Sequence, residues 1–465
     1  MVTAKTPGII RQTAALPRIG THTPHGTARR ANGSVPATGA VRRNMKETAL
    51  PLKTCPLDRA ESPEAAGLSA RRLQAISSVL NADVDRRKIP GAVVLIARKG
   101  RIAWFEAFGF EHADAPSRPM QRHSVFRIAA MTRPVVGAAA LMLMEEGRLA
   151  LNDPVEHYIP EFARVQVGVE TVDANSGERR LALAPVRRAM TVHDLFRHTS
   201  GLTYGQFGDS LVQRQYRENG LMDPAQSNAE MVTKLAALPL QCQPGEVFEY
   251  GMSTDVLGRI IEIVSGMDLD RFVAERVTQP LGMHATGFRL IRQDGAGLAV
   301  PFRDSAVPSA LFAYDDDNPP RWHSGGAGLL STAGDYARFC QMLLNGGVLD
   351  RVRVLSRKSV DLMLANHLPP GADYGGSTRG LGINAPLPEL GQGHGLAVGV
   401  RTERGLCPVP GSVGDFYWGG ALGTYFWADP QEQLFAILML QENDLATRAG
   451  YRSLLRNIVY GALED

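Results

Sequence analysis

The 465-residue sequence has no run of 18 or more apolar residues, so no segment is long enough to cross a bilayer as a helix. Its four cysteines, Cys55, Cys242, Cys340 and Cys407, stand far apart, with no CxxC pair and no histidine at metal-ligand spacing. These absences argue against a membrane span, a zinc site and a dithiol redox motif. We therefore expect a soluble protein of the reducing cytoplasm, with no membrane partner, no metal and no cofactor.

Acidic residues are absent from residues 1–46, which carry eight of the 50 basic side chains. Because the formal charge of the whole chain is +3, the remainder is mildly acidic, and we expect no nucleic-acid partner. Residues 1–46 are rich in Thr, Pro, Gly and Ala and lack the apolar region of a secretory signal, which predicts a basic disordered head. Two other interpretations of the head remain open: translation from Met45, and a transit peptide.

The N-terminal part after this head predicts a helix, a hairpin and a buried helix. Residues 66–85 carry apolar positions at helical spacing, and residues 91–110 read as two strands that turn at Lys99-Gly100. The ten-residue apolar stretch from Val135 to Met144 is too short for a membrane span and predicts a helix buried on all sides.

From residue 150 to about 325 the pattern is mostly helical, with caps expected at Thr191 and Ser253 and helix stops at Gly201 and Gly266. One exception is an alternation of apolar residues on both sides of the turn sequence Asn175-Ser176-Gly177, which predicts an inserted β-ribbon.

The C-terminal part returns to strands. YFWADP and LFAILMLQ predict two strands, and an amphipathic helix is expected from about Ala446 to Ala462. Strands near both ends and helices between them predict an α/β fold, in which one antiparallel sheet is assembled from both chain ends and flanked by helices. We expect an α/β part at about 66–149 and 325–465, a helical subdomain at about 150–324, and the cleft at their seam.

Several separated motifs point to one enzyme family. FRIAAMTRPV precedes the buried helix, FEYGMSTDVLGRIIE leads into another helix, and FYWGGALGTYFWADP opens the C-terminal strands. Together with HTSGLTYG, GGAGLLSTAGDYARF and QPLGM, they resemble the β-lactamase-related serine hydrolases, including esterases with a class C β-lactamase-like fold. The resemblance covers about residues 66–465 and implies a β-lactamase/transpeptidase-like fold, related to that of penicillin-binding proteins.

The resemblance also implies a site made of Ser-x-x-Lys, a tyrosine, and a Lys-Thr-Gly or Trp-Gly-Gly strand. Three residues of spacing place the lysine one helical turn from the serine, where lysine and tyrosine can take the hydroxyl proton. Tyr250 stands at the tyrosine position, Trp418, Gly419 and Gly420 at the strand, and Ala421 would supply one oxyanion N–H.

The first motif is broken at both functional positions. Ala130 occupies the nucleophile position and Arg133 the base position. Alanine has no atom that can attack an acyl carbon, and a guanidinium stays charged and cannot act as a base. Acyl-enzyme hydrolysis at this site is therefore expected to be lost.

No substitute nucleophile emerges from the sequence. None of the seven lysines follows a serine by three positions. Thr132 is two residues from position 130, about 200° around a helix, and would point away. Ser210 lies in a GDSL sequence without the Asp-x-x-His of the lipases that use one, and Ser253 fails the G-x-S-x-G pattern and reads as a helix cap.

Other candidates receive structural interpretations more readily than catalytic ones. His198 reads as structural, while for His323 a cleft position and a surface position are equally expected. Trp418 is placed in the cleft by its motif, and the remaining tryptophans, Trp104, Trp322 and Trp427, are expected in packing. Met252 stands where penicillin-recognising relatives have asparagine, which weakens a specific β-lactam interpretation.

Three hypotheses follow from the sequence. The first is a family member that keeps the fold and a ligand cleft without hydrolysis, and binds a small ester, amide or anion. The second is altered chemistry, with Tyr250 as acid or base, Arg133 pairing with an anionic substrate group, and water or a second substrate attacking. The third is ordinary esterase activity from a site elsewhere. The oligomeric state is left open.

Overall fold

The computed structural model describes residues 57–465 apart from 113–117, 292–294, 296, 303–318 and 443. The expected basic head, the interpretation of Met45 and Cys55 therefore lie outside the described residues. The described part belongs to one compact unit, Lys53–Asp465. No helix in these described ranges is both long and apolar enough to span a membrane.

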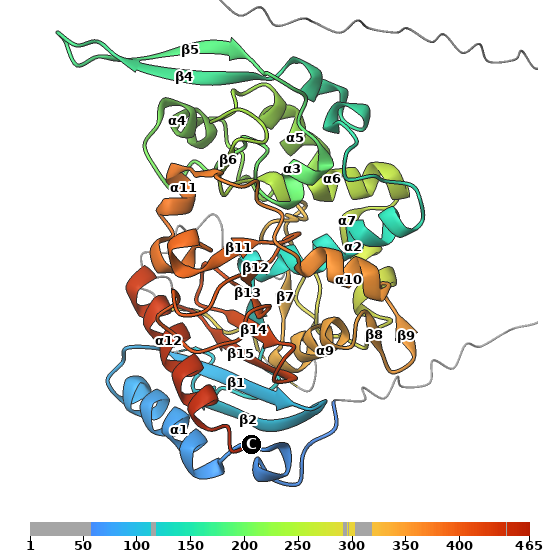
Figure 1. The fold of residues 1–465 in the computed structure, drawn as a ribbon, viewed down its shortest axis with the longest axis vertical. Helices are drawn as coiled ribbons and strands as arrows, with labels where there is room; N and C mark the ends of the chain where they lie inside the picture. Colours follow the sequence, from blue (N-terminus) through green and yellow to red (C-terminus); the bar gives the residue numbers. More distant parts are fainter. Residues whose placement is uncertain (1–56, 113–117, 292–294, 296, 303–318, 443) are drawn as a thin grey trace, which may run out of the picture. The chain divides into compact units, whose positions relative to one another are not determined.

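A seven-stranded antiparallel sheet forms the centre of the unit, in the order β11-β12-β13-β14-β15-β1-β2. The N-terminal hairpin β1–β2 is added beside the last C-terminal strand, so both chain ends build one sheet, as the sequence predicts (Figure 1). The strands are β1 (Gly91–Arg98), β2 (Arg101–Gly109), β11 (Gln392–His394), β12 (Gly399–Arg401), β13 (Phe416–Gly419), β14 (Tyr425–Asp429) and β15 (Leu434–Leu440).

Helices cover both faces of this sheet. Strand β1 is buried along its whole length, because its side chains alternate between two hydrophobic clusters. Ala92, Val94 and Ile96 pack with α1 (Ala70–Asp85) and α12 (Leu445–Gly461), whereas Val93 and Leu95 share the main core with α2 (Thr132–Glu145) and α9 (Ala333–Leu344). The amphipathic terminal helices and α2, which is buried from Thr132 to Leu143, thus lie where their apolar residues require.

The segment from residue 150 to 329 contains helices and a two-stranded ribbon among its described residues. The described α-helices are α3 (Val192–Phe196), α4 (Leu211–Glu218), α5 (Asn228–Ala236), α6 (Ser253–Ser265) and α7 (Leu269–Val273), and the last continues into a π-helical turn at Ala274–Thr278. Helices α10 (Arg357–Leu364) and α11 (Gly376–Arg379) follow later. Two-stranded pairs link the parts: β3 (Phe126–Arg127) with β7 (Leu330–Ser331), β6 (Val247–Phe248) with β10 (Asp373–Tyr374), and β8 (Val348–Leu349) with β9 (Val352–Arg353).

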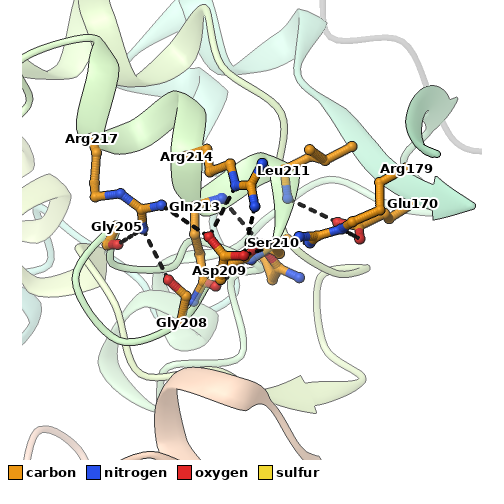
Figure 2. Close-up of polar contacts among 11 residues, drawn as sticks. Glu170, Arg179, Gly205, Gly208, Asp209, Ser210, Leu211, Gln213, Arg214 and Arg217 are labelled. Atoms are coloured by element: carbon orange, nitrogen blue, oxygen red, sulfur yellow. Dashed lines mark hydrogen bonds and ion pairs between the residues drawn. The ribbon is translucent and has the colours of Figure 1, made fainter. Parts of the chain in front are cut away.

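The predicted β-ribbon is confirmed as β4 (Gln166–Val172) paired with β5 (Arg179–Pro185), and it extends outward from the helical part (Figure 1). Glu170 of β4 and Arg179 of β5 hold it against the start of α4. Arg179, Arg214 and Arg217 converge on Asp209, and the Leu211 N–H donates to Glu170 (Figure 2).

Of the four expected helix caps and stops, two are confirmed and two are wrong. Thr191 forms a capping box at α3, and Gly266, at φ 73°, ends α6. Ser253 does not cap α6: it is the first helical residue, after Met252, and its hydroxyl is bonded to that of Ser200 at 2.8 Å. Gly201 does not stop α3, which already ends at Phe196, because His198 adopts a left-handed φ of 56°.

Candidate active site

The segment before α2 presents position 130 to a cleft. A 3-10 turn, Ala129–Met131, precedes the helix, and Ala129 is held at φ 44°, a left-handed conformation that costs a non-glycine residue about 1–2 kcal/mol. The surrounding contacts enforce it: the Ile128 N–H donates to the Leu329 carbonyl at 3.1 Å, and Thr424 Oγ1 donates to the Ile128 carbonyl at 3.1 Å. Backbone strain of this kind is typically found at functional sites. Here it lies next to Ala130, whose side chain has no functional group.

The end of β13 packs directly against this segment. A Cβ at Gly420 would collide with Thr424 Oγ1 and the Ile128 carbonyl oxygen, so only glycine allows the two segments to approach. Ala421 follows, and its N–H has no acceptor among the described residues. Ala130 and Ala421 line the same cleft, so position 130 and the Ala421 N–H lie on one cavity.

The cleft has two lobes that meet at Ala130, Phe207, Tyr250 and Ala421. The first lobe, of about 460 Å³, is mainly apolar and extends to Met222 and Ala327. The second, of about 470 Å³, extends along Trp418 and Leu381 to two arginines of α12, Arg448 and Arg452. We call the first the apolar lobe and the second the polar lobe.

Arg133 is buried and lines the cleft, and both of its terminal nitrogens are engaged by the protein, whereas its Nε has no hydrogen-bond partner among the described residues. One terminal nitrogen donates to Tyr204 Oη at 2.6 Å, and the other contacts His198 Nε2 at 2.8 Å and Thr254 Oγ1 at 3.2 Å. The guanidinium carbon lies 4.4 Å from the centre of the Tyr250 ring. Arg133 is thus bonded within the protein through both terminal nitrogens while it lines the cleft, and its pairing with a substrate anion stays a prediction.

The charge of Arg133 is stabilised by its surroundings. Burial alone would lower its pKa, but Tyr204, Tyr250 and Asp255 outweigh burial and raise the pKa above its ordinary value. Burial raises the pKa of Tyr204, which remains a neutral phenol, and lowers the pKa of His198 well below its usual range. Because Arg133 donates to Nε2, the proton of the neutral His198 ring lies on Nδ1. Arg133 thus cannot serve as a general base.

Asp255 is the buried carboxylate whose negative charge acts on Arg133. Its Oδ1 accepts hydrogen bonds from Ser324 Oγ at 2.5 Å and from the Gly326 N–H at 3.1 Å, whereas Oδ2 has no hydrogen-bond partner in the described part of the chain. Burial raises the pKa of this carboxyl, against the lowering effects of Ser324 and Arg133. The ionised form therefore depends on the positive charge nearby.

Tyr250 reaches the cleft from the loop between β6 and α6. Its backbone N–H donates to Thr378 Oγ1 at 2.9 Å, and its ring packs 5.7 Å from that of Trp418. Tyr250 and Trp418 are both nearly buried, with 5% and 3% exposure, and both line the cleft. The structure thus brings all seven residues singled out at the site around one cleft: Ala130, Arg133, Tyr250, Trp418, Gly419, Gly420 and Ala421.

The alternative hydroxyls have structural partners. Thr132 Oγ1 accepts a hydrogen bond from the Leu329 N–H at 3.0 Å, away from the cleft. Ser210 caps α4, accepting from the Gln213 N–H at 3.1 Å (Figure 2). His323 lies against Asp270 and Phe288 and is absent from the lining of both lobes. None of the three is placed to replace a nucleophile at position 130.

Two sets of cleft residues escape sequence reasoning. Tyr204, which binds Arg133, is visible in HTSGLTYG, but only the fold shows that it faces the guanidinium. Arg448 and Arg452 stand four residues apart on an amphipathic terminal helix, a spacing that predicts a shared face without indicating what the face meets.

No group of three or more metal-ligating side chains occurs among the residues for which the structure gives positions.

Buried neutral histidines predict acid sensitivity. His198 and His394 are fully buried, and burial lowers the pKa of His394 to about 3 and that of His198 well below 6.5. Below about pH 6.5 these histidines therefore bind protons in the unfolded chain but not in the folded chain. Their contribution to the free energy of unfolding is present above this pH and is lost as the pH falls. Each of the two contributes a slope of up to about 1.4 kcal/mol per pH unit.

We expect the urea midpoint of unfolding to decrease when the pH is lowered from 7 to 5. A His394→Gln variant should lose part of this dependence of stability on pH. The half-buried His193, with a pKa lowered by burial to about 4, adds a smaller contribution that solvent screens. An unfolding midpoint that does not change over this range would contradict the expectation.

Comparison with known proteins agrees with this geometry. The family model described as Beta-lactamase matches residues 76–460. Protein Rv1367c of Mycobacterium tuberculosis is 36% identical over 363 residues, which cover 77% of this chain and 87% of that protein. Esterase EstB of Burkholderia gladioli is 28% identical over 406 residues, 81% of this chain and 91% of that protein. Among solved structures, EstCE1, described as a hydrolase with promiscuous acyltransferase activity, aligns with a TM-score of 0.66 and 26% identity over 84% of this chain and 98% of that one.

Proposed function

Because the chain belongs to the beta-lactamase family, and to its esterase and acyltransferase branch, we propose that it is a member that binds small ligands in its cleft without forming an acyl-enzyme. One observation carries this proposal: Ala130 replaces the nucleophile while Arg133 replaces the base and is engaged by Tyr204 and His198. Both terminal nitrogens of Arg133 are bonded to other side chains, and reversing only one of the two substitutions would not rebuild the catalytic pair.

The ligand class is proposed from the two lobes. The Ala421 N–H suits a carbonyl or carboxylate oxygen, and the apolar lobe next to it suits a short acyl group. Arg448 adds a positive charge to the polar lobe, where it donates to the Gly420 carbonyl at 3.3 Å. A small ester or amide, or the corresponding carboxylic acid, matches this order of groups.

The cytoplasm stays the proposed location.

Labelling with a fluorophosphonate probe tests the proposal. We expect no adduct by intact-mass measurement, because the reagent needs an activated hydroxyl and position 130 has none. Titration with p-nitrophenyl butyrate should still quench tryptophan fluorescence, since Trp418 lines the cleft. A single labelled serine, identified by peptide mapping, would show that a working nucleophile lies elsewhere.

A second candidate function is hydrolysis without a serine, favoured by the position of Tyr250, which lines both lobes and packs against the Arg133 cation. In this case the Tyr250 phenolate takes a proton from a water molecule that attacks a bound ester carbonyl, and it returns the proton to the alcohol oxygen when the ester C–O bond breaks. Turnover of p-nitrophenyl acetate by the natural protein, abolished in Tyr250→Phe but unaffected in Ser210→Ala, would support this candidate. Absence of turnover in the natural protein would eliminate it for simple esters.

A further inference from the structure

A separate pocket lies beside the cleft, between α12, the strands β11, β13 and β14, and residues 407–409. We call it the α12 pocket. Its volume of about 470 Å³ equals that of the polar lobe, and it shares only Asn384 and Arg452 with that lobe. Arg452 therefore lies between the cleft and the α12 pocket, which is not part of the candidate active site.

Positive charge exceeds negative charge around this pocket. Arg401 and Arg456 are both buried, and they share one carboxylate, that of Asp415, at 3.0 Å and 2.8 Å. The two arginines also hold the segment beside the pocket in place. Arg401 donates to the Val409 carbonyl at 3.2 Å, and Arg456 donates to the Pro410 carbonyl at 3.3 Å. One carboxylate thus serves two buried guanidinium groups.

Two further arginines of α12, Arg448 and Arg452, form no close ion pair among the described residues, although Asp444 and Glu442 act on Arg448 from a greater distance. Within the described part of the chain, no acidic oxygen lies within 4 Å of Arg448 or Arg452. Arg452 donates to neutral oxygens, Asn384 Oδ1 at 2.6 Å and the Gly420 carbonyl at 3.3 Å, and its Nε has no partner. Burial, and then the charge of Arg448, lower the pKa of Arg452 to about 10. An anion beside Arg452 would relieve this repulsion.

The rest of the lining selects the kind of anion. Ile383, Leu390, Val409 and Ala449 make apolar walls. The polar side chains opposite them are already paired, since Tyr417 Oη donates to Gln392 Oε1 at 2.6 Å and Gln392 Nε2 contacts Cys407 Sγ at 3.4 Å. Such a pocket offers apolar contacts and two arginines, of which Arg456 is already paired with Asp415 and only Arg452 lacks a carboxylate, and beyond Ser453 it has few free donors for a phosphate or a sugar.

We propose that the α12 pocket is a second binding site, for a small monocarboxylate with a compact apolar body, held through its carboxylate by Arg452. Arginine suits this role because its planar fork pairs with both oxygens of a carboxylate. Since Arg452 also donates to the Gly420 carbonyl, at the end of the strand that forms the cleft, a bound carboxylate acts on the cleft through this one side chain. The proposal does not depend on whether the cleft hydrolyses its ligand.

Calorimetric titration of the full chain with phenylacetate, and with the uncharged 2-phenylethanol, tests the proposal. We expect phenylacetate to bind at least about tenfold more tightly, because only the carboxylate pairs with Arg452. Arg452→Met should remove this preference. Equal binding of the two compounds, or no binding of phenylacetate, overturns the proposal.

Two matched variants on α12 decide which hollow is occupied. Ala449 lines only the α12 pocket and Leu445 only the cleft, one helical turn away, so Ala449→Trp fills the first and Leu445→Trp the second. We expect phenylacetate binding to be lost in Ala449→Trp and retained in Leu445→Trp, and the reverse result assigns the ligand to the cleft. If Ala449→Trp does not fold, Val409→Trp fills the α12 pocket from the opposite wall and replaces it.

Phenylacetate should also slow the alkylation of Cys407 by iodoacetamide, because this thiol lies in the pocket lining. Cys242, outside the pocket and partly exposed, is the internal control, read by peptide mapping in the same sample. Equal slowing at both thiols would mean a general effect on the protein and would contradict binding at the α12 pocket.

Discussion

The double substitution Ala130→Ser/Arg133→Lys is expected to create esterase activity well above that of the natural chain. Loss of the nucleophile in a serine hydrolase typically costs about 10⁶ in kcat, or about 8 kcal/mol of transition-state stabilisation. The rest of the site is in place: the strained turn at Ala129, the Ala421 N–H and Tyr250 in the same cleft. We expect turnover of p-nitrophenyl acetate at least about 100-fold above that of the natural protein.

Single substitutions are the matched controls for this gain. Ala130→Ser alone keeps Arg133, whose raised pKa prevents it from taking the serine proton, and Arg133→Lys alone has no nucleophile. Both should remain inactive, and Tyr250→Phe in the double variant should abolish the gain. A folded double variant with no activity would mean that the cleft has lost more than these two side chains.

Removal of the Arg133 charge is expected to be strongly destabilising. Arg133→Met leaves Tyr204 and His198 without their donor, and it leaves the buried Asp255 carboxylate without its positive neighbour. Breaking a buried charge arrangement in this way costs about 3–5 kcal/mol. Urea unfolding followed by circular dichroism measures the change in the free energy of unfolding.

The exposed pair Arg357–Asp361 supplies the control for this measurement. Its side chains are 69% and 48% exposed, and Arg357→Met should change stability by less than about 1 kcal/mol. Asp255→Asn combined with Arg133→Met should recover part of the loss, because the unpaired negative charge is then removed. If Arg133→Met matches the exposed control, the network around Arg133 contributes little to stability.

The secondary structure followed from local patterns. The hairpin at Lys99-Gly100, the ribbon around Asn175-Ser176-Gly177 and the final helix all have a clear period and a turn signal, and the structure has each of them. Ser253 was misassigned because a serine before an apolar run has the composition of a cap, whereas its hydroxyl here is engaged by Ser200 from a distant segment. Such tertiary partners leave no trace in local sequence.

By itself the sequence determined the β-lactamase-related fold and the loss of the Ser-x-x-Lys pair, because both are matters of which residue stands in which motif. Only the tertiary structure decided what Arg133 does, since its partners Tyr204 and His198 are more than 60 residues away in the chain. The same holds for Arg448 and Arg452. Helical spacing puts them on one face of α12, but the shortage of carboxylates around that face results from packing, which joins residues that no sequence pattern connects.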